Sequence, residues 1–546
     1  MHVRRRRVYL PRNEQIYAMR PVPRQSNHLS TTVVLAAILG LTFLLRMKFW
    51  NQPFEMDEGL HAYMGWGVLQ GLVPFKDMYN TKPPGIYALH TLLFLFAEPT
   101  ALNIKVFASI YTLVTAMAVF FVARKLAGDT AALVAALFFG IFSSGPNIQG
   151  GGVNSEVFMI LPYTLAAHSL ITAVQTGRSR SYLLAGIWTG VACTLKQVAV
   201  VNLFWVAGYL LVHLWLEKDK PKRSRVLANG IWVFLGSVLP WLPFLIYFYY
   251  YDALGNFFYW MVSANFKYIG DGYQELPNFS LFLGRMKSVL SENGLLWILA
   301  LLGITWRWQE LRRPISLAPK NEPRIEDRLI WALMATWPVF SFIGVLLGGR
   351  FFSHYYIQLI PSLAVLGGVG LVSLIDKIRA RGLGFFRRGS GVIATLAVAS
   401  TLVLYVKTDM SYYLQYNGTQ ISLHQYGSPL FSVTRFIGNY LKDRTQPEDL
   451  IYVWAVNPEI NFYALRKSPS PFLIQTDLDH IPWNAHEEVV QSLKKRPPKY
   501  IVAMQDMSLF PWLKDYVQNN YRAETSDDLN KLEVLVPFAI YKRKGI

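Results

Sequence analysis

Apolar runs of membrane-spanning length recur along most of the chain. A run of about 20 apolar residues is long enough to cross the hydrocarbon core of a bilayer as a helix. Eleven such segments are predicted, at residues 31–49, 101–122, 130–146, 156–174, 182–196, 198–216, 229–250, 293–306, 329–347, 354–373 and 391–407. The pattern therefore predicts a polytopic α-helical membrane protein.

The chain changes character after residue 407. Asp, Lys, Pro and Asn return, and the short β-rich runs LIYVWAV, KYIVAM and EVLVPFAIYKR alternate with helical patterns. This alternation is typical of a small α/β domain. The predicted organisation is a basic N-terminal segment (1–30), a transmembrane domain (31–407) and a C-terminal α/β domain (408–546).

The loops between the apolar runs are of two kinds. Alternate loops carry Lys and Arg clusters, among them KDKPKRSR and DKIRARGLGFFRR, and such loops face the cytoplasm. The Arg-rich N-terminus belongs on the same side, so an odd number of spans places the C-terminal domain outside the cytoplasm. The opposite loops are aromatic and rich in Pro and Gly, and we expect the chemistry there, in residues 50–100, 144–156, 251–292 and 348–356.

Composition narrows the possibilities further. Hydrophobic residues make up 53% of the chain and charged residues only 16%, which excludes an ordinary soluble domain. The net charge of +19 is spread over short clusters between apolar runs, so it indicates membrane topology and not a nucleic-acid surface. Cys193 is the one cysteine, which excludes an intrachain disulfide and a Cys-based zinc site.

The first extracytoplasmic loop is unusually rich in ionisable groups. It contains FEMDEGLHAYMGWGVLQGLVPFKDMYNTKPPG, in which helical spacing from Leu60 to Leu72 predicts a short amphipathic helix at the membrane interface. The KPPG sequence then predicts the start of the next helix. Charges this close to hydrocarbon are a functional hypothesis by default. The alternative is that Asp57 and Glu58 only complement a helix dipole and that Lys82 is an interfacial anchor.

Several motifs together resemble a known family. They are MDEGLHAY and PFKDMYNTKPPG after the first span, GGGVNSEVFM before the fourth, LKQ after the fifth and GGRFFSHYYIQLIPSLAVL at the tenth. This set resembles the GT-C membrane glycosyltransferases, in the branch of the protein O-mannosyltransferases and the aminoarabinose transferase of lipid A. The resemblance covers nearly the whole chain, including an α/β tail on the outer side.

The resemblance implies a glycosyltransferase that uses a polyprenyl-phosphate-linked sugar donor in the membrane lipid. The acceptor would be a glycan, a lipid or a protein on the extracytoplasmic face. The sequence has no dinucleotide-binding or phosphate-loop fingerprint, which agrees with a lipid-borne donor. Transfer would invert the anomeric carbon, because the acceptor attacks opposite the departing phosphate.

The same resemblance suggests roles for individual residues. Asp57 is expected as the general base, with Glu58 beside it in the catalytic pair. Positive charge for the departing phosphate is expected from Lys82, Arg350 and His354, and a hydrogen bond from Tyr355.

Four further residues are expected to bind substrate. Glu156 would orient the acceptor or hold sugar hydroxyls, or else it only caps the fourth span. Lys196, beside Gln197, would contact the lipid phosphate or pair with a nearby acid. Lys105 stands where many relatives have Arg, and would grip phosphate as a point charge.

Two further points stay open at this level. Asp57 and His61 lie four residues apart, on one helix face, so a divalent metal is possible, although no cofactor is otherwise expected. The stretch FFYWMVSANFKYIGDGY could stack on sugars or seat its loop in the membrane interface.

Two other functional classes compete with the enzyme. A transporter or flippase for a polyprenyl-linked or anionic substrate would also need many spans and buried charges. Transporters tend to place those charges at the midplane and to contain related halves, whereas here the charges gather near one face and no repeat is visible. A sensor with a ligand-binding outer domain leaves the loop carboxylates unexplained.

Overall fold

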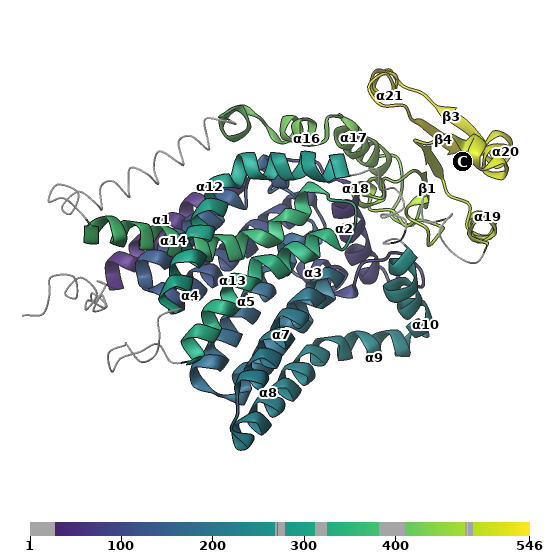
Figure 1. The fold of residues 1–546 in the computed structure, drawn as a ribbon. Coiled ribbons are helices and arrows are strands. Elements are labelled where there is room, and N and C mark those ends of the chain that lie inside the picture. The colour runs from purple at the N-terminus through teal and green to yellow at the C-terminus, as the bar shows by residue number, and fades with distance from the viewer. Residues whose placement is uncertain are drawn as a thin grey trace, which may run out of the picture.

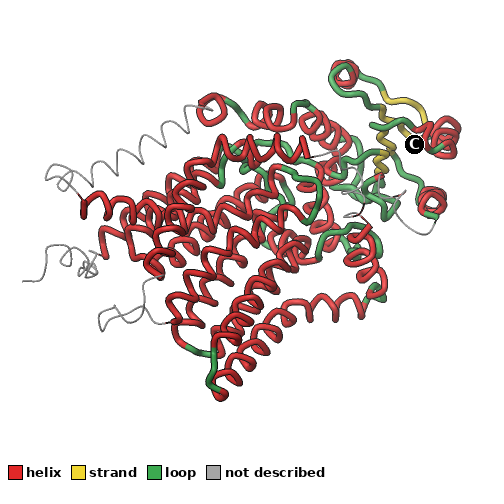
Figure 2. The backbone as a smooth tube through the Cα atoms, in the orientation of Figure 1, coloured by secondary structure: helices red, strands yellow, loops and turns green. Residues whose placement is uncertain are grey.

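The computed structural model describes residues 28–267, 270, 279–311, 325–381, 410–475, 478 and 484–545. Long helices lie side by side in a bundle, and a small sheet-containing region sits at one end of it (Figure 1). Within the described ranges, the strands lie in that C-terminal region (Figure 2). The architecture confirms the predicted fold class.

Eight helical segments among the described residues are long and apolar enough to cross a membrane. They are formed by α1 (His28–Met47), α4 (Ala101–Phe142), α5 (Ser155–Thr176), α7 (Val200–Leu216), α8 with α9 (Lys220–Val238 and Leu242–Tyr250), α12 (Phe279–Leu311), α13 (Ile325–Leu346) and α14 (Ile360–Arg381). These segments make the chain a multi-pass membrane protein.

Four predicted spans need comment. Helix α4 covers the span 101–122 and most of the span 130–146, and its backbone leaves the helical region at Gly128, where φ is 81°. Glycine adopts that conformation without steric penalty. The predicted span 182–196 is α6 (Ser179–Leu195), which at 17 residues is short for a span. The predicted span 391–407 lies outside the described residues.

Helix α12 begins well before the predicted start at residue 293, so part of the predicted loop 251–292 is helical. Several polar groups in this first part of α12 have hydrogen-bond partners. The backbone N–H of Asn147 donates to the Glu292 carboxylate at 2.8 Å. The hydroxyls of Ser288 and Ser291 donate to carbonyls about one turn earlier in their own helix.

Helix α2 (Met56–Leu69) corresponds to the predicted amphipathic helix. Residues 58–67 are all buried, because α3 (Pro84–Phe94) and α18 (Glu459–Ala464) both pack against α2. Glu55 caps the helix: the Glu58 N–H donates to its carboxylate, and the Glu58 carboxylate accepts from the Glu55 N–H, both at 3.1 Å. Helix α3 starts at the KPPG sequence, as predicted.

The C-terminal region is a four-stranded mixed sheet with helices. Its order is β1-β2-β4-β3, with β1 and β2 parallel and the other pairs antiparallel. The elements are α16 (Gly418–Tyr426), α17 (Leu430–Lys442), β1 (Ile451–Trp454), α18, α19 (Ala485–Lys495), β2 (Tyr500–Ala503), α20 (Pro511–Asn520), β3 (Tyr521–Glu524), α21 (Asp527–Glu533) and β4 (Ala539–Arg543).

The C-terminal region contacts the end of the bundle that carries α2 and the segment after it (Figure 1). The Phe54 N–H donates to the Tyr463 hydroxyl at 2.8 Å, and the Ser468 N–H donates to the Tyr63 hydroxyl at 2.8 Å. The Tyr79 hydroxyl donates to Glu488 at 2.9 Å. These contacts fix α2 between the membrane helices and the α/β region.

Candidate active site

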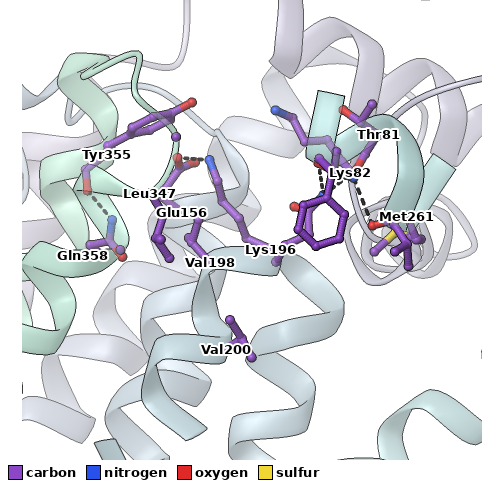
Figure 3. Close-up of a pocket in the computed structure, with 16 residues that line it drawn as sticks. Thr81, Lys82, Glu156, Lys196, Val198, Val200, Met261, Leu347, Tyr355 and Gln358 are labelled. Atoms are coloured by element: carbon purple, nitrogen blue, oxygen red, sulfur yellow. Dashed lines mark hydrogen bonds and ion pairs between the residues drawn. The ribbon is translucent and has the colours of Figure 1, made fainter. Parts of the chain in front are cut away.

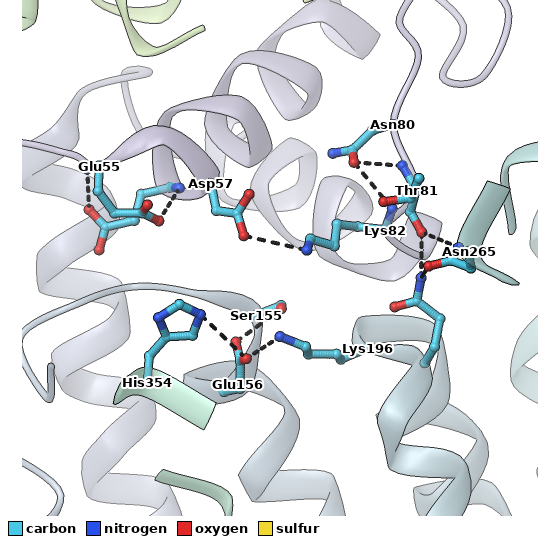
Figure 4. Close-up of polar contacts among 12 residues, drawn as sticks. Glu55, Asp57, Asn80, Thr81, Lys82, Ser155, Glu156, Lys196, Asn265 and His354 are labelled. Atoms are coloured by element: carbon cyan, nitrogen blue, oxygen red, sulfur yellow. Dashed lines mark hydrogen bonds and ion pairs between the residues drawn. The ribbon is translucent and has the colours of Figure 1, made fainter. Parts of the chain in front are cut away.

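The first turn of α2 and the loop before α3 bring an acid and a lysine together. The Lys82 Nζ lies 3.4 Å from Oδ2 of Asp57, and both side chains keep some exposure, 14% and 19% (Figure 4). Burial alone would raise the pKa of Asp57, but the positive charge of Lys82, with smaller effects from nearby cations and His61, lowers that pKa below its usual range. The Asp57 carboxylate is therefore ionised at neutral pH.

A second group of charged side chains forms around Glu156, in the first turn of α5. Its Oε1 accepts from Lys196 Nζ and lies 3.7 Å from Nε2 of His354. The ammonium of Lys196 also lies 4.5 Å from the centre of the Tyr355 ring, a cation–π contact. The structure thus joins four predicted residues, and Lys196 shows the pairing with an acid that was one of its two predicted alternatives.

The two groups face each other (Figure 4). In that view Asp57 and Lys82 lie on one side, while Lys196 and His354 flank Glu156 on the other. The approach depends on Gly85, in the first turn of α3: a Cβ there would lie 2.5 Å from the carbonyl oxygen of Thr194. Glycine therefore lets the segment after Lys82 pack directly against the end of α6.

A pocket of about 320 Å³ lies between the two lysines (Figure 3). Its polar wall includes both lysines, Glu156 and Tyr355, and the rest of its wall is largely apolar. The residues that line it are Thr81, Lys82, Glu156, Lys196, Gln197, Val198, Val200, Met261, Val262, Asn265, Phe266, Gly344, Leu347, Gly348, Tyr355 and Gln358. Such a cavity suits a ligand with an anionic head and an apolar tail.

Glu58 and Lys105 are placed differently from the prediction. The Lys105 Nζ lies 3.2 Å from Glu58 Oε1 and also donates to the Gly151 carbonyl at 3.1 Å. The Val153 N–H donates to the same carboxylate, and both charged side chains are only 1% exposed. They form a buried pair that ties α2 to α4 and to the glycine-rich loop, and neither is among the described residues that line the pocket.

Arg350 and Gln197, both predicted to bind substrate, differ in their relation to the pocket. Arg350 lies in the turn before Phe351, whose φ is +50°, and it is not among the described pocket-lining residues. The Gln197 side chain does line the pocket, but its amide donates to the Thr81 carbonyl and to Asn265. Of the two, only Gln197 borders the space where a ligand would lie.

His61 is fully buried, and neither of its ring nitrogens has a hydrogen-bond partner within the described structure. Burial lowers the pKa of His61 to about 3, so the ring is neutral. Among the described residues, no group of three or more His, Cys, Asp or Glu side chains could hold a metal ion. Asp57 and His61 alone do not fit a metal site, and no step below uses one.

Sequence reasoning missed three side chains that support the site. Glu55 could have been found from the Glu-x-x-Glu spacing of a capping box. Gln149, from the glycine-rich loop, contacts His354 Nδ1 through its Oε1 at 3.0 Å. Asn265 contacts the loop before Lys82. Gln149 and Asn265 contact residues far away in the sequence, and no local sequence pattern predicts such contacts.

Comparison with known proteins supports the fold. Residues 81–244 match the family model described as dolichyl-phosphate-mannose-protein mannosyltransferase. Residues 434–544 match a model of the Ccs4 C-terminal domain, of a competence-induced protein. Comparison with curated proteins gives no sequence match.

Solved structures match over most of the chain. ArnT from Cupriavidus metallidurans bound to undecaprenyl phosphate is 15% identical with a TM-score of 0.60, over 93% of this chain and 97% of that one. Its apo form matches at 14% identity and a TM-score of 0.57, over 94% and 98%. The oligosaccharyltransferase AglB from Archaeoglobus fulgidus, in complex with an inhibitory peptide and a dolichol-phosphate, is 13% identical with a TM-score of 0.55, over 88% and 70%.

Proposed function

We propose that this multi-pass membrane protein, whose fold is that of the GT-C membrane glycosyltransferases, transfers a sugar from a polyprenyl-phosphate-linked donor to an acceptor. The acceptor is a glycan, a lipid or a protein on the extracytoplasmic face. The observation that carries the proposal is the pocket between Lys82 and Lys196, which combines two cations with an apolar wall. The similar structures with undecaprenyl phosphate and dolichol-phosphate support a donor of this class.

In this proposal the donor phosphate lies between the two lysines. Val198, Val200 and Leu347 line the same pocket and provide apolar surface for the start of the isoprenoid tail. Fixed cations stabilise the charge that the phosphate gains as it leaves. The Tyr355 ring and His354 keep Lys196 and Glu156 in place on the far side of the pocket.

Asp57 is the proposed general base. The acceptor oxygen or nitrogen forms a bond to the anomeric carbon as the bond from that carbon to the phosphate oxygen breaks, and the acceptor proton passes to the Asp57 carboxylate. The phosphate departs with the electron pair as polyprenyl phosphate. No separate acid is required, because the departing phosphate is a good leaving group once its charge is paired.

The ion pair between Asp57 and Lys82 links the basicity of Asp57 to donor binding. In the free protein Lys82 lowers the pKa of Asp57 against the effect of burial and makes it a weak base. A donor phosphate competes for the same ammonium, so donor binding frees the carboxylate and raises its basicity. The base is thereby strengthened when a donor is present.

Glu58 and Lys105 have a structural part in this scheme. Their buried pair holds the first turn of α2 against α4, and so fixes the helix from which Asp57 projects. Arg350 has no assigned contact with the donor.

Replacing Asp57 with Asn tests the assignment. We expect transfer to fall by about a hundredfold or more, the range for loss of a general base. Glu98→Gln is the control, since Glu98 is an exposed acid in the same loop. A D57N variant that turns over at the wild-type rate would refute the role of Asp57.

Two experiments test the identity of the sugar donor and the membrane topology. Mass spectrometry of lipid-linked sugars with and without the protein should show a donor accumulating in its absence, which identifies the sugar. A topology reporter fused after residue 546 should be active only outside the cytoplasm, as the charge pattern of the loops requires. Activity inside would place the C-terminal region on the wrong side.

A further inference from the structure

Hydrogen bonds from the side chains of Asn80 and Tyr87 hold the backbone on either side of Lys82. The Asn80 Oδ1 accepts from the backbone N–H of Thr81 at 2.6 Å and from that of Lys82 at 3.3 Å. The Tyr87 hydroxyl donates to the Lys82 carbonyl at 3.0 Å. These local contacts set the direction in which the Lys82 side chain leaves the loop.

Two amides from distant segments hold the carbonyl that precedes Lys82. The Thr81 carbonyl oxygen accepts from Asn265 Nδ2 at 2.8 Å and from Gln197 Nε2. The same Gln197 nitrogen donates to Asn265 Oδ1 at 3.0 Å, so the two amides also bind each other. We call Gln197 and Asn265 the amide pair; both line the pocket.

Asn265 is itself fixed by an unusual helical segment. Residues Tyr259–Ser263 form a π-helix, an element found frequently at functional sites. The Asn265 Nδ2 lies 2.9 Å from the Trp260 carbonyl and 3.2 Å from the Met261 carbonyl. Trp260 is buried and stacks on Tyr79, with ring centres 4.9 Å apart. The amide pair therefore joins a rigid segment to the Lys82 loop.

We infer that Gln197 and Asn265 are positioning residues for the proposed transfer, which hold Lys82 where it can reach the donor phosphate. The inference rests on the proposed function. The Lys82 ammonium forms an ion pair with Asp57 and, in the proposed reaction, also binds the donor phosphate. A small shift of the Lys82 backbone would therefore strengthen one of these two contacts and weaken the other. Both members of the pair act through the Thr81 carbonyl and not through contact with the reacting atoms.

The test uses the full chain in lipid nanodiscs and measures two quantities, the Kd for polyprenyl phosphate and the steady-state constants for the lipid-linked donor. Asn265→Ala removes one of the two bonds to the Thr81 carbonyl and also the partner of the Gln197 amide. It is expected to raise the Kd and the donor KM about tenfold, with a smaller change in kcat. Asn103→Ala is the matched control, because the Asn103 amide also donates to a backbone carbonyl, that of Glu98, in an exposed position.

A second variant separates positioning from general loop stability. In a Lys82→Met background, N265A should have little further effect on the Kd, because the residue it positions is gone; a purely structural role predicts that the two losses add. Asn265→Asp should be as damaging as N265A, since it places a carboxylate beside the Thr81 carbonyl.

The outcomes distinguish failure of the proposed function from failure of the positioning inference. A wild-type protein that does not bind polyprenyl phosphate refutes the proposed function and this inference with it. A wild-type protein that binds, together with an N265A variant of equal Kd and donor KM, refutes the inference alone. Full additivity of N265A and K82M also refutes it.

Discussion

Gly59 offers a sharp test of how α2 is held. It lies two residues after Asp57 and faces α18: a Cβ on Gly59 would lie 2.1 Å from the Cβ of Glu459 and 2.5 Å from its Cα. Carbon atoms in contact are normally about 3.5–4.0 Å apart, so Gly59→Ala requires a separation of about 1.5 Å between the two helices. Side-chain rotation cannot relieve this, because the nearest atoms are backbone and Cβ.

The expected losses follow from that displacement. Overpacking of a well-packed contact costs about 1–3 kcal/mol of stability. A misplacement of about 1 Å at a catalytic group costs on the order of a hundredfold in rate. We therefore expect G59A to melt at a lower temperature and to lose most of its kcat. The donor KM should change less, because Lys82 and Lys196 are held by other elements.

The assay compares transfer rate and melting temperature in lipid nanodiscs for G59A and a matched variant. Gly40→Ala is suitable, since Gly40 is an exposed helical glycine in α1 and a Cβ added there would meet no atom within 4 Å. Alanine at that position should be neutral or slightly stabilising. A G59A protein with the rate and melting temperature of the wild type would show that α18 does not fix α2.

Three other predictions follow from buried or paired charges. Lys105→Met leaves the Glu58 carboxylate buried without its cation, so we expect a loss of about 3–5 kcal/mol, seen as a lower melting temperature; an unchanged value would contradict the pairing. Burial raises the pKa of Glu459 to about 7, so the folded state binds the proton more tightly and stability falls as pH rises from about 4 to 7. Glu459→Gln should therefore gain stability over the wild type at pH 8 and not at pH 4, and an equal effect at both would count against a buried charge. Burial raises the pKa of Asp57, but Lys82, with smaller effects from His61, Lys196 and His354, lowers it below its usual range. The acid limb of the kcat/KM profile should therefore lie below the usual aspartate pKa of about 3.9. Lys82→Met should move this limb to higher pH, and a limb that does not move would argue against Asp57 as the base.

Local sequence signals predicted much of the structure. The KPPG start of α3 and the β-rich runs that became β1 and β2 depend on nearest neighbours, and the structure confirms them. Lys196 interrupts an apolar stretch, which indicated a partner, and the partner is Glu156. In each case the chemistry of a few adjacent residues is enough.

Other features depend on contacts that no local pattern records. The sequence around α2 predicted a helix but not its burial, which comes from packing against α3 and against α18 far along the chain. Strand β3 (Tyr521–Glu524) was missed because its sequence, YRAE, is short and polar, and its pairing with β4 forms it. Glu58 and Lys105 were predicted as site residues from the family resemblance, and the structure pairs them with each other.

The packing of α18 on α2 determines when, during synthesis of the chain, the site can be completed. The Tyr463 hydroxyl that receives the Phe54 N–H lies 409 residues further along the chain. Translation therefore delivers the helix bearing Asp57 early and the segment that buries it near the end. Until α18 docks, the side of α2 that carries Gly59 lacks the helix that packs against it. A nascent or truncated chain would therefore hold an incomplete site, and the proposed sugar transfer would begin only after the C-terminal region has folded onto the first loop.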